Sequence, residues 1–180
     1  MTAWAILTAV GTDRLGIVDD LSSILESWQC NIEESKMAVL GDQFAVILLF
    51  AGPQQQVQEL IDGGERWEAV KDLHIELRTT TPGHGRKQGL VYMVETVSLD
   101  APGIVHAVTR VLRDFGINIE ELDTETGAAP FTGSPMFVMR LRVILPEAVA
   151  PAAVRESLSR IAQHRDLDIK LEPVLPLHTG

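Results

Sequence analysis

The amino-acid sequence contains one pattern twice, and this internal repeat limits the fold more than any other feature. The first copy reads Asp13-Arg-Leu-Gly-Ile-Val and, after a helical run, Asn31-Ile-Glu-Glu. The second copy reads Asp100-Ala-Pro-Gly-Ile-Val and then Asn118-Ile-Glu-Glu, at a constant offset of 87 positions, as from 13 to 100. A pattern that keeps its register over this length indicates a duplicated structural unit.

The length and composition agree with two folded domains. A chain of 180 residues with 46% hydrophobic and 22% charged residues has the composition of a globular protein rather than a disordered one. We therefore predict one domain at 1–81, a Gly-rich linker at 82–88 and a second domain at 89–180.

The charge of the chain argues against nucleic acid as a direct partner. The 15 basic and 25 acidic residues give a formal net charge of −10, and no basic cluster is present to displace counterions from phosphates. We interpret the densest basic stretch, Arg86-Lys87, as solvated charge in the linker. With neither a leader pattern at the amino terminus nor an apolar run of about 18 residues, we expect a cytoplasmic protein.

The single cysteine and the five histidines predict neither a disulfide nor a metal site. Cys30 occupies the place that Ile117 takes in the second copy, so we interpret it as a buried apolar residue rather than a reactive thiol. His106 stands where the first copy has Asp19, and we interpret it as a surface residue. No cofactor is expected.

Hydrophobic periodicity predicts the order strand, helix, strand, strand, helix, strand in each copy. This order predicts an α+β fold of two ferredoxin-like units, each a four-stranded antiparallel sheet with both helices on one face. The strands expected in the first copy cover 5–10, 31–40, 43–50 and 73–80, with helices from Ile17 and from near Pro53. The second copy has helices from Ile104 and from near Pro146, a hairpin over 118–145 with a longer loop at 127–135, and a closing strand at 167–175.

Two further predictions concern surfaces of these units. The strand Ala45-Val-Ile-Leu-Leu-Phe50 is apolar on both sides, so we expect its open face to contact another copy, within the chain or across a dimer. The Pro/Gly-rich loop at 127–135 fits either an added functional segment or a plain connection.

The repeated turn before each first helix has the chemistry of a site for a free amino acid. Gly16 and Gly103 let the backbone approach a ligand closely, and the unpaired N–H groups at a helix start suit a carboxylate. Asp13 and Asp100 stand nearby to accept an ammonium group. The amides of Asn31 and Asn118, at the start of the next strand, can bond either end of such a ligand.

A simpler interpretation of the same residues is structural. Asp before a helix is a common capping or turn residue, and Asn after a helix is a common left-handed terminator. Each polar residue would then only complete its helix. The recurrence of both positions in both copies favours the ligand site for the protein as a whole.

These residues resemble the ACT domain, a small-molecule regulatory module whose members bind amino acids where two such domains meet. The resemblance rests on Asp-Xaa-Xaa-Gly-Ile-Val, the apolar helix, Asn-Ile-Glu-Glu and the hairpin, and the two copies cover nearly the whole chain. More narrowly, 8–18 and 30–41 resemble the tandem-ACT transcriptional repressors of the glycine cleavage system. Leu15 departs from the pattern, because proline, which Pro102 keeps, often stands at this position.

The resemblance implies a regulator that contacts a DNA-binding activator instead of DNA, with glycine, serine or a related amino acid as its signal. It implies ligand contacts at Asp13, Arg14, Leu15, Gly16, Ile17 and Asn31, and at Asp100, Ala101, Pro102, Gly103, Ile104 and Asn118.

Two other classes of function stay open at this point. Formyltetrahydrofolate deformylases carry a similar amino-terminal module, but this chain has no catalytic domain after it and no nucleophile paired with a base, so we expect no enzyme activity. A protein-interaction module that senses nothing would keep the apolar helix stripes but would not need the repeated Asp and Asn.

Overall fold

The computed structural model describes residues 1–63, 65–81, 89–129 and 133–174. The chain divides into two compact units, Met1–His84 and Gly85–Gly180. The predicted linker at 82–88, with Arg86 and Lys87, lies outside the described residues, so the predicted domain limits stay a prediction.

The first unit has the predicted order of elements, with a short extra helix. Its strands form one antiparallel sheet in the order β2-β3-β1-β4. The elements are β1 (Thr2–Thr12), α1 (Ile17–Ser27), β2 (Asn31–Leu40), β3 (Gln43–Pro53), α2 (Gln54–Ile61), the 3₁₀ helix η1 (Glu65–Val70) and β4 (His74–Thr80).

The second unit repeats this topology. Its sheet has the order β6-β7-β5-β8, which corresponds strand by strand to that of the first unit. The elements are β5 (Leu90–Leu99), α3 (Ile104–Asp114), β6 (Asn118–Ala128), β7 (Pro135–Leu145), α4 (Pro151–Arg165) and β8 (Asp168–Pro173). The prediction of two ferredoxin-like units is thereby confirmed.

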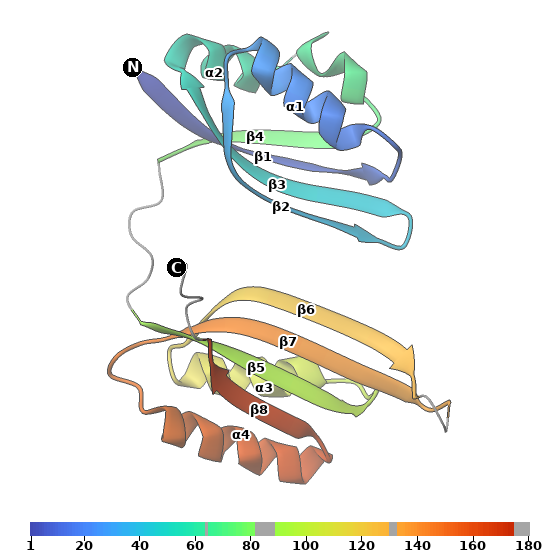
Figure 1. Cartoon of the computed structure of the whole chain (residues 1–180), viewed down its shortest axis with the longest axis vertical. Helices are drawn as coiled ribbons and strands as arrows, with labels where there is room; N and C mark the ends of the chain where they lie inside the picture. Colours follow the sequence, from blue (N-terminus) through green and yellow to red (C-terminus); the bar gives the residue numbers. More distant parts are fainter. Residues whose placement is uncertain (64, 82–88, 130–132, 175–180) are drawn as a thin grey trace, which may run out of the picture. The chain divides into compact units, whose positions relative to one another are not determined.

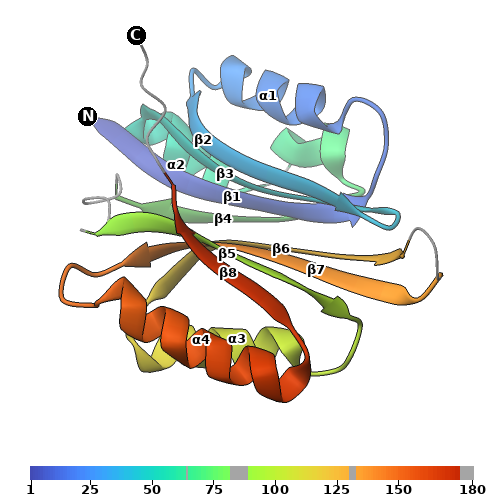
Figure 2. The ribbon, with the colours of Figure 1, turned by 60° about the horizontal axis from the view of Figure 1, so that its bottom comes forward.

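Each unit packs its helices on one face of its sheet and buries a core between the two layers (Figures 1 and 2). In the first unit, Leu21 and Leu25 of α1 lie in one buried cluster with Leu7, Phe44 and Phe50 of the sheet. The second unit repeats this layer with a second buried cluster: Val108, Leu112, Val94, Phe137 and Met139. The helix stripes predicted from periodicity are therefore the core faces, because apolar residues on one helix face leave water together.

Two predicted boundaries in the second unit are wrong. Its second helix begins at Pro151 rather than near Pro146, because Pro146 opens a turn in which the Val149 N–H bonds the Pro146 carbonyl at 2.9 Å. Pro151 takes the first helical position, where a missing N–H costs nothing. The hairpin loop is also shorter than predicted, since Gly127 and Pro135 lie within β6 and β7.

Cys30 is buried, as predicted. Only 8% of its surface is exposed, and burial raises the pKa of its thiol. Ile117 takes the equivalent place in the second core at 5% exposure. Both residues therefore serve as apolar groups that close the core where the chain leaves a helix for an edge strand.

The helix-free faces of the two sheets differ in character. In the first unit, Val10 and Ile47 leave 46% and 48% of their surface exposed on this face. In the second unit Arg140 takes the place of Ile47 and pairs with Glu95 at 3.3 Å, while Val97 takes the place of Val10. A contact of the first face with another copy of the domain stays a prediction.

Candidate functional site

The turn between β1 and α1 is held by backbone geometry. Gly16 has φ 90° and ψ 0°, a left-handed conformation that L side chains disfavour, and it is the residue from which α1 begins. The Asp13 N–H donates to the Asp42 carbonyl at 2.8 Å, which ties the turn to the β2–β3 hairpin. The first bond of the helix runs from the Asp20 N–H to the Gly16 carbonyl at 2.9 Å, so the N–H groups of the preceding helical residues point out of the helix end.

The turn between β5 and α3 has the same construction. Gly103 has φ 89° and ψ 7°. The Asp100 N–H donates to the Pro135 carbonyl at 2.9 Å, and the Ala107 N–H to the Gly103 carbonyl at 3.0 Å. The two copies therefore share a backbone cradle as well as a sequence pattern.

The interpretation of the repeated Asp as helix caps and of the repeated Asn as left-handed helix terminators is wrong. Neither α1 nor α3 has a side-chain hydrogen bond at its amino-terminal cap, so Asp13 and Asp100 do not cap them. Asn31 and Asn118 are the first residues of β2 and β6. Near them, the left-handed positions that end the helices belong to Gln29, with φ 56°, and to Gly116, with φ 68°. None of these four polar residues therefore caps or ends a helix through its side chain.

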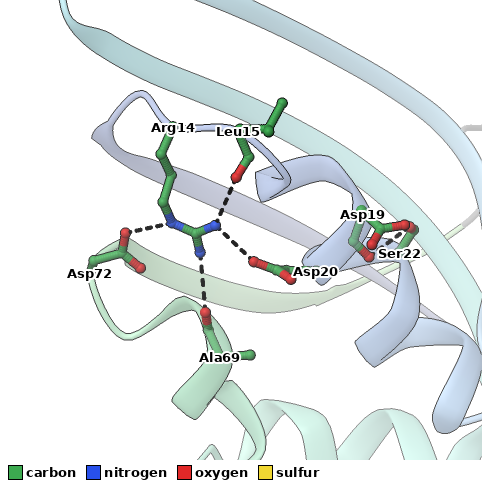
Figure 3. Close-up of polar contacts among 7 residues, drawn as sticks. All are labelled: Arg14, Leu15, Asp19, Asp20, Ser22, Ala69 and Asp72. Atoms are coloured by element: carbon green, nitrogen blue, oxygen red, sulfur yellow. Dashed lines mark hydrogen bonds and ion pairs between the residues drawn. The ribbon is translucent and has the colours of Figure 1, made fainter.

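Arg14 forms the densest polar network of the first turn (Figure 3). Its guanidinium contacts Asp72 at 2.9 Å and Asp20 at 2.8 Å. It also donates to the carbonyls of Ala69 at 3.1 Å and Leu15 at 3.3 Å. The hydrogen bond to Asp72 is the main cause that raises the pKa of Arg14, and the same bond lowers the pKa of Asp72. Arg14 thus joins the turn, the first turn of α1 and the segment before β4.

A cavity of about 370 Å³, open to solvent, lies beside this turn. Asp13, Arg14, Leu15, Gly16 and Ile17 all line it, so the structure brings the five predicted turn residues of the first copy together. Sequence reasoning missed the other lining residues, Val18, Asp19, Met37 and Phe44. Strand alternation was the available signal, because it places Met37 and Phe44 on the helix side of adjacent strands.

Like the Asp19 carboxylate, the Asp13 carboxylate is a polar group of this cavity that stays available to a ligand. Within the part of the chain that the structure describes, it forms no hydrogen bond or ion pair of its own, whereas the Arg14 charge is matched by two carboxylates. A carboxylate beside the amino end of a helix provides an acceptor and donors within a few ångströms of each other. This arrangement suits a zwitterion.

The predicted pairing of the turn with asparagine is wrong within a single unit. The register places Asn31 opposite Ala51, which in turn pairs with Trp4, whereas the turn follows Thr12 at the other end of β1. Eight residues of strand separate the two ends by roughly 27 Å. Asn118 is separated from the second turn in the same way, through Ile144 and Val91. One amino acid cannot touch both groups in one unit.

The second turn is built from different side chains. Ala101 and Pro102 replace Arg14 and Leu15, and Ala107 replaces Asp20, so the ion-pair network has no counterpart there. Instead, the Arg165 guanidinium at the end of α4 lies 3.5 Å from the position that a Cβ atom on Gly103 would take. Sequence reasoning missed Arg165, because the approach of α4 to this turn is a tertiary contact.

The described residues hold no cluster of metal ligands. Among them, no group of three or more His, Cys, Asp or Glu side chains could hold a metal ion. His106 is exposed, as expected of a surface residue. No helix in the described ranges is long and apolar enough to span a membrane.

The comparisons with known proteins agree with the fold. The ACT domain family model matches residues 4–80. The chain is 25% identical over 158 residues to the glycine cleavage system transcriptional repressor of Escherichia coli (strain K12), a match covering 88% of this chain and 83% of that protein.

Solved structures give the same picture. An unknown protein from Galdieria sulphuraria is 35% identical, with a TM-score of 0.84 over 97% of this chain and 100% of that chain. A candidate glycine cleavage system transcriptional repressor is 20% identical, with a TM-score of 0.73 over 98% of this chain and 99% of that chain, which shows the shared fold. The first unit therefore belongs to the ACT-domain family, and the chain carries two ferredoxin-like units in tandem.

Proposed function

We propose that this protein is an amino-acid-responsive regulator that controls transcription by contacting a protein partner. The observation that carries the proposal is the duplicated turn, in which Asp13 and Asp100 stand beside a left-handed glycine and an uncapped helix end. Keeping this arrangement in both copies serves no helix-capping purpose. A ligand with both an ammonium group and a carboxylate would bind both parts of this arrangement, the Asp side chain and the N–H groups at the helix end.

The proposed binding mode follows from the donors and acceptors of the turn. The ligand carboxylate accepts from the outward N–H groups at the start of the helix, where the helix dipole also favours negative charge. The ligand ammonium group donates to Asp13 in the first unit and to Asp100 in the second. Arg14 acts as a positioning residue, since its four contacts hold the turn in place.

Asn31 and Asn118 enter the proposal only through a second copy of the chain. Each lies on an exposed end of an edge strand, about 27 Å along the sheet from the turn of its own unit. A second chain that packs in the opposite direction brings such an asparagine to the turn. The ligand would then be held by two copies and would favour their association.

Similarity to the repressor of Escherichia coli supports a role in transcription, with glycine as the first signal to test. The net charge of −10 supports contact with a protein rather than with DNA, because binding to phosphates gains its affinity from basic residues. Regulation requires that the ligand change the affinity for the partner, and the partner must then change the affinity for the ligand by the same factor.

Thermal unfolding of the full chain against free amino acids tests this proposal. A ligand that binds the native state at 100 times its Kd stabilises it by about 2.7 kcal/mol, enough for a clear rise in the unfolding midpoint. We expect the rise to be lost in Asp13→Asn for the first site and in Asp100→Asn for the second. Asp42→Asn, in the adjacent hairpin, serves as the matched control because its side chain lies outside the residues that line the cavity.

The contradicting outcome is a midpoint that no amino acid changes at millimolar concentration. The protein would then be an interaction module that senses nothing, and both Asp variants would bind protein partners as the unmodified chain does.

A further inference from the structure

The cavity of the first unit has an apolar wall. Met37 of β2 lines the cavity and pairs with Val46, which is buried on the helix side of the sheet. Val39, two residues further along β2, lies outside the lining and pairs with the buried Phe44. Met37 nevertheless leaves 55% of its surface exposed, because α1 does not extend over the edge strand. Val18, on the first turn of α1, is 52% exposed across the same cavity.

The floor and the rim of the cavity are apolar as well. Phe44 forms the floor and is 1% exposed. Leu15 stands on the rim and is 99% exposed, with its side chain directed away from the Arg14 network (Figure 3). A cluster of large apolar side chains exposed to solvent marks a surface that binds a ligand or a partner.

The second unit has no such wall at the corresponding positions. Thr124 pairs with Met139 as Met37 pairs with Val46, and Thr126 pairs with Phe137 as Val39 pairs with Phe44. The rim residue Leu15 is replaced by Pro102. Among the described residues, the second unit therefore has Thr124 and Pro102 in place of Met37 and Leu15, although it keeps the backbone cradle and an apolar Val105 in place of Val18.

We propose that the cavity of the first unit takes an α-amino acid with an aliphatic side chain, such as leucine, and discriminates against glycine. This inference rests on the proposed function and assigns the class of ligand at one of its two turns. The ammonium group meets Asp13, and the aliphatic group covers Met37 and Val18. Glycine meets the same polar groups but leaves the wall in water. A volume of about 370 Å³ is near the lower end of the roughly 300–1,000 Å³ typical of small-molecule sites.

The apolar area that the ligand covers on Met37 and Val18 sets the expected ratio of leucine affinity to glycine affinity. Each methylene group that leaves water strengthens binding about fourfold. A leucine side chain has four carbons, and the open shape of the cavity covers about half of them. Leucine is therefore expected to bind the first unit roughly 15-fold more tightly than glycine.

Isothermal titration of the full chain with leucine and with glycine tests this inference. In Met37→Thr, which installs the residue of the second copy, leucine affinity should fall about fourfold, the share of one covered carbon, while glycine affinity stays unchanged. Ile47→Thr is the matched control, because Ile47 is 48% exposed on the neighbouring strand but points to the opposite face of the sheet. We expect the leucine preference to survive in Ile47→Thr.

The outcomes separate the inference from the proposed function. If glycine binds the first unit as tightly as leucine and Asp13→Asn removes both of these binding events, the regulator stands and the aliphatic preference is overturned. An equal loss of leucine affinity in Met37→Thr and Ile47→Thr would also overturn it. If neither amino acid binds the first unit, the inference fails, and the proposed function fails as well only if no amino acid raises the unfolding midpoint.

Discussion

The left-handed glycine of each turn leads to a quantitative prediction about stability. A Cβ atom on Gly16 would meet no atom within 4 Å, so space is not what requires glycine there. Its φ of 90° is the cause, because an L side chain in a left-handed conformation costs about 1–2 kcal/mol. Gly16→Ala should therefore destabilise the first unit by about this amount without any loss of packing.

The assay uses the uneven distribution of tryptophan. The chain has three tryptophans, Trp4, Trp28 and Trp67, and all of them lie in the first unit. Tryptophan fluorescence therefore follows unfolding of that unit in the full chain. Because 1 kcal/mol shifts the midpoint of a small domain by about 4–8 °C, Gly16→Ala should lower the fluorescence midpoint by roughly 4–16 °C.

Three control variants identify the cause. Gly103→Ala places the same strain in the second unit, so the fluorescence midpoint should stay unchanged while a calorimetric transition moves down. Gly16→Asn should recover part of the loss, since asparagine tolerates left-handed conformations. Gly127→Ala, also in the second unit, has open space around its Cβ position and no left-handed φ, so it should leave the calorimetric transition that Gly103→Ala lowers nearly unchanged. A fluorescence midpoint that Gly16→Ala leaves unchanged would refute the argument from backbone strain.

Three further predictions concern the network and the cores. In Arg14→Gln, stability measured by tryptophan fluorescence should fall at neutral pH. Arg14 lowers the folded-state pKa of Asp72 below its unfolded value of 3.8. The stability that this ion pair contributes is therefore present above pH 3.8 and is lost as the pH falls further. A stability difference between Arg14→Gln and the unmodified chain that stays constant from pH 7 to 2 would contradict this reasoning. Leu112→Ala should cost about 3–5 kcal/mol in the second unit, since Leu112 is 0% exposed, and a calorimetric scan should show only the second transition moved. Thr96→Val should stabilise the same unit by about 1 kcal/mol, because the buried Thr96 hydroxyl has no partner among the described residues, and a lower calorimetric midpoint would show that it has one.

Local patterns were enough to predict most of the fold from the sequence. The spacing of Leu21 and Leu25 in one copy, and of Val108 and Leu112 in the other, marks a helix face through periodicity alone. The Gly41-Asp42 dipeptide marks a hairpin, and the predicted first strand of that hairpin matches β2 residue for residue. Repetition at a constant offset supplied the number of units. These signals are readable because each depends on residues close together in the chain.

The start of a helix was harder to predict where two nearby prolines each fit its first position. Pro146 and Pro151 both fit the first position of a helix, and the sequence alone does not choose between them. The turn that precedes α4 decides in favour of Pro151. Residues 13–17 line one cavity together for a simple local reason, because they are contiguous in the chain.

The sequence by itself determined the repeat, the order of the elements, the core faces and the chemistry of the turn, since periodicity and turn preferences act over a few residues. Only the tertiary structure decided which distant groups meet. Antiparallel pairing moves Asn31 to the far end of the sheet from Asp13, and it brings Met37 beside the turn. The fold also carries Asp72 to Arg14 from 58 positions away. Such contacts depend on the path of the whole chain, which no local pattern encodes.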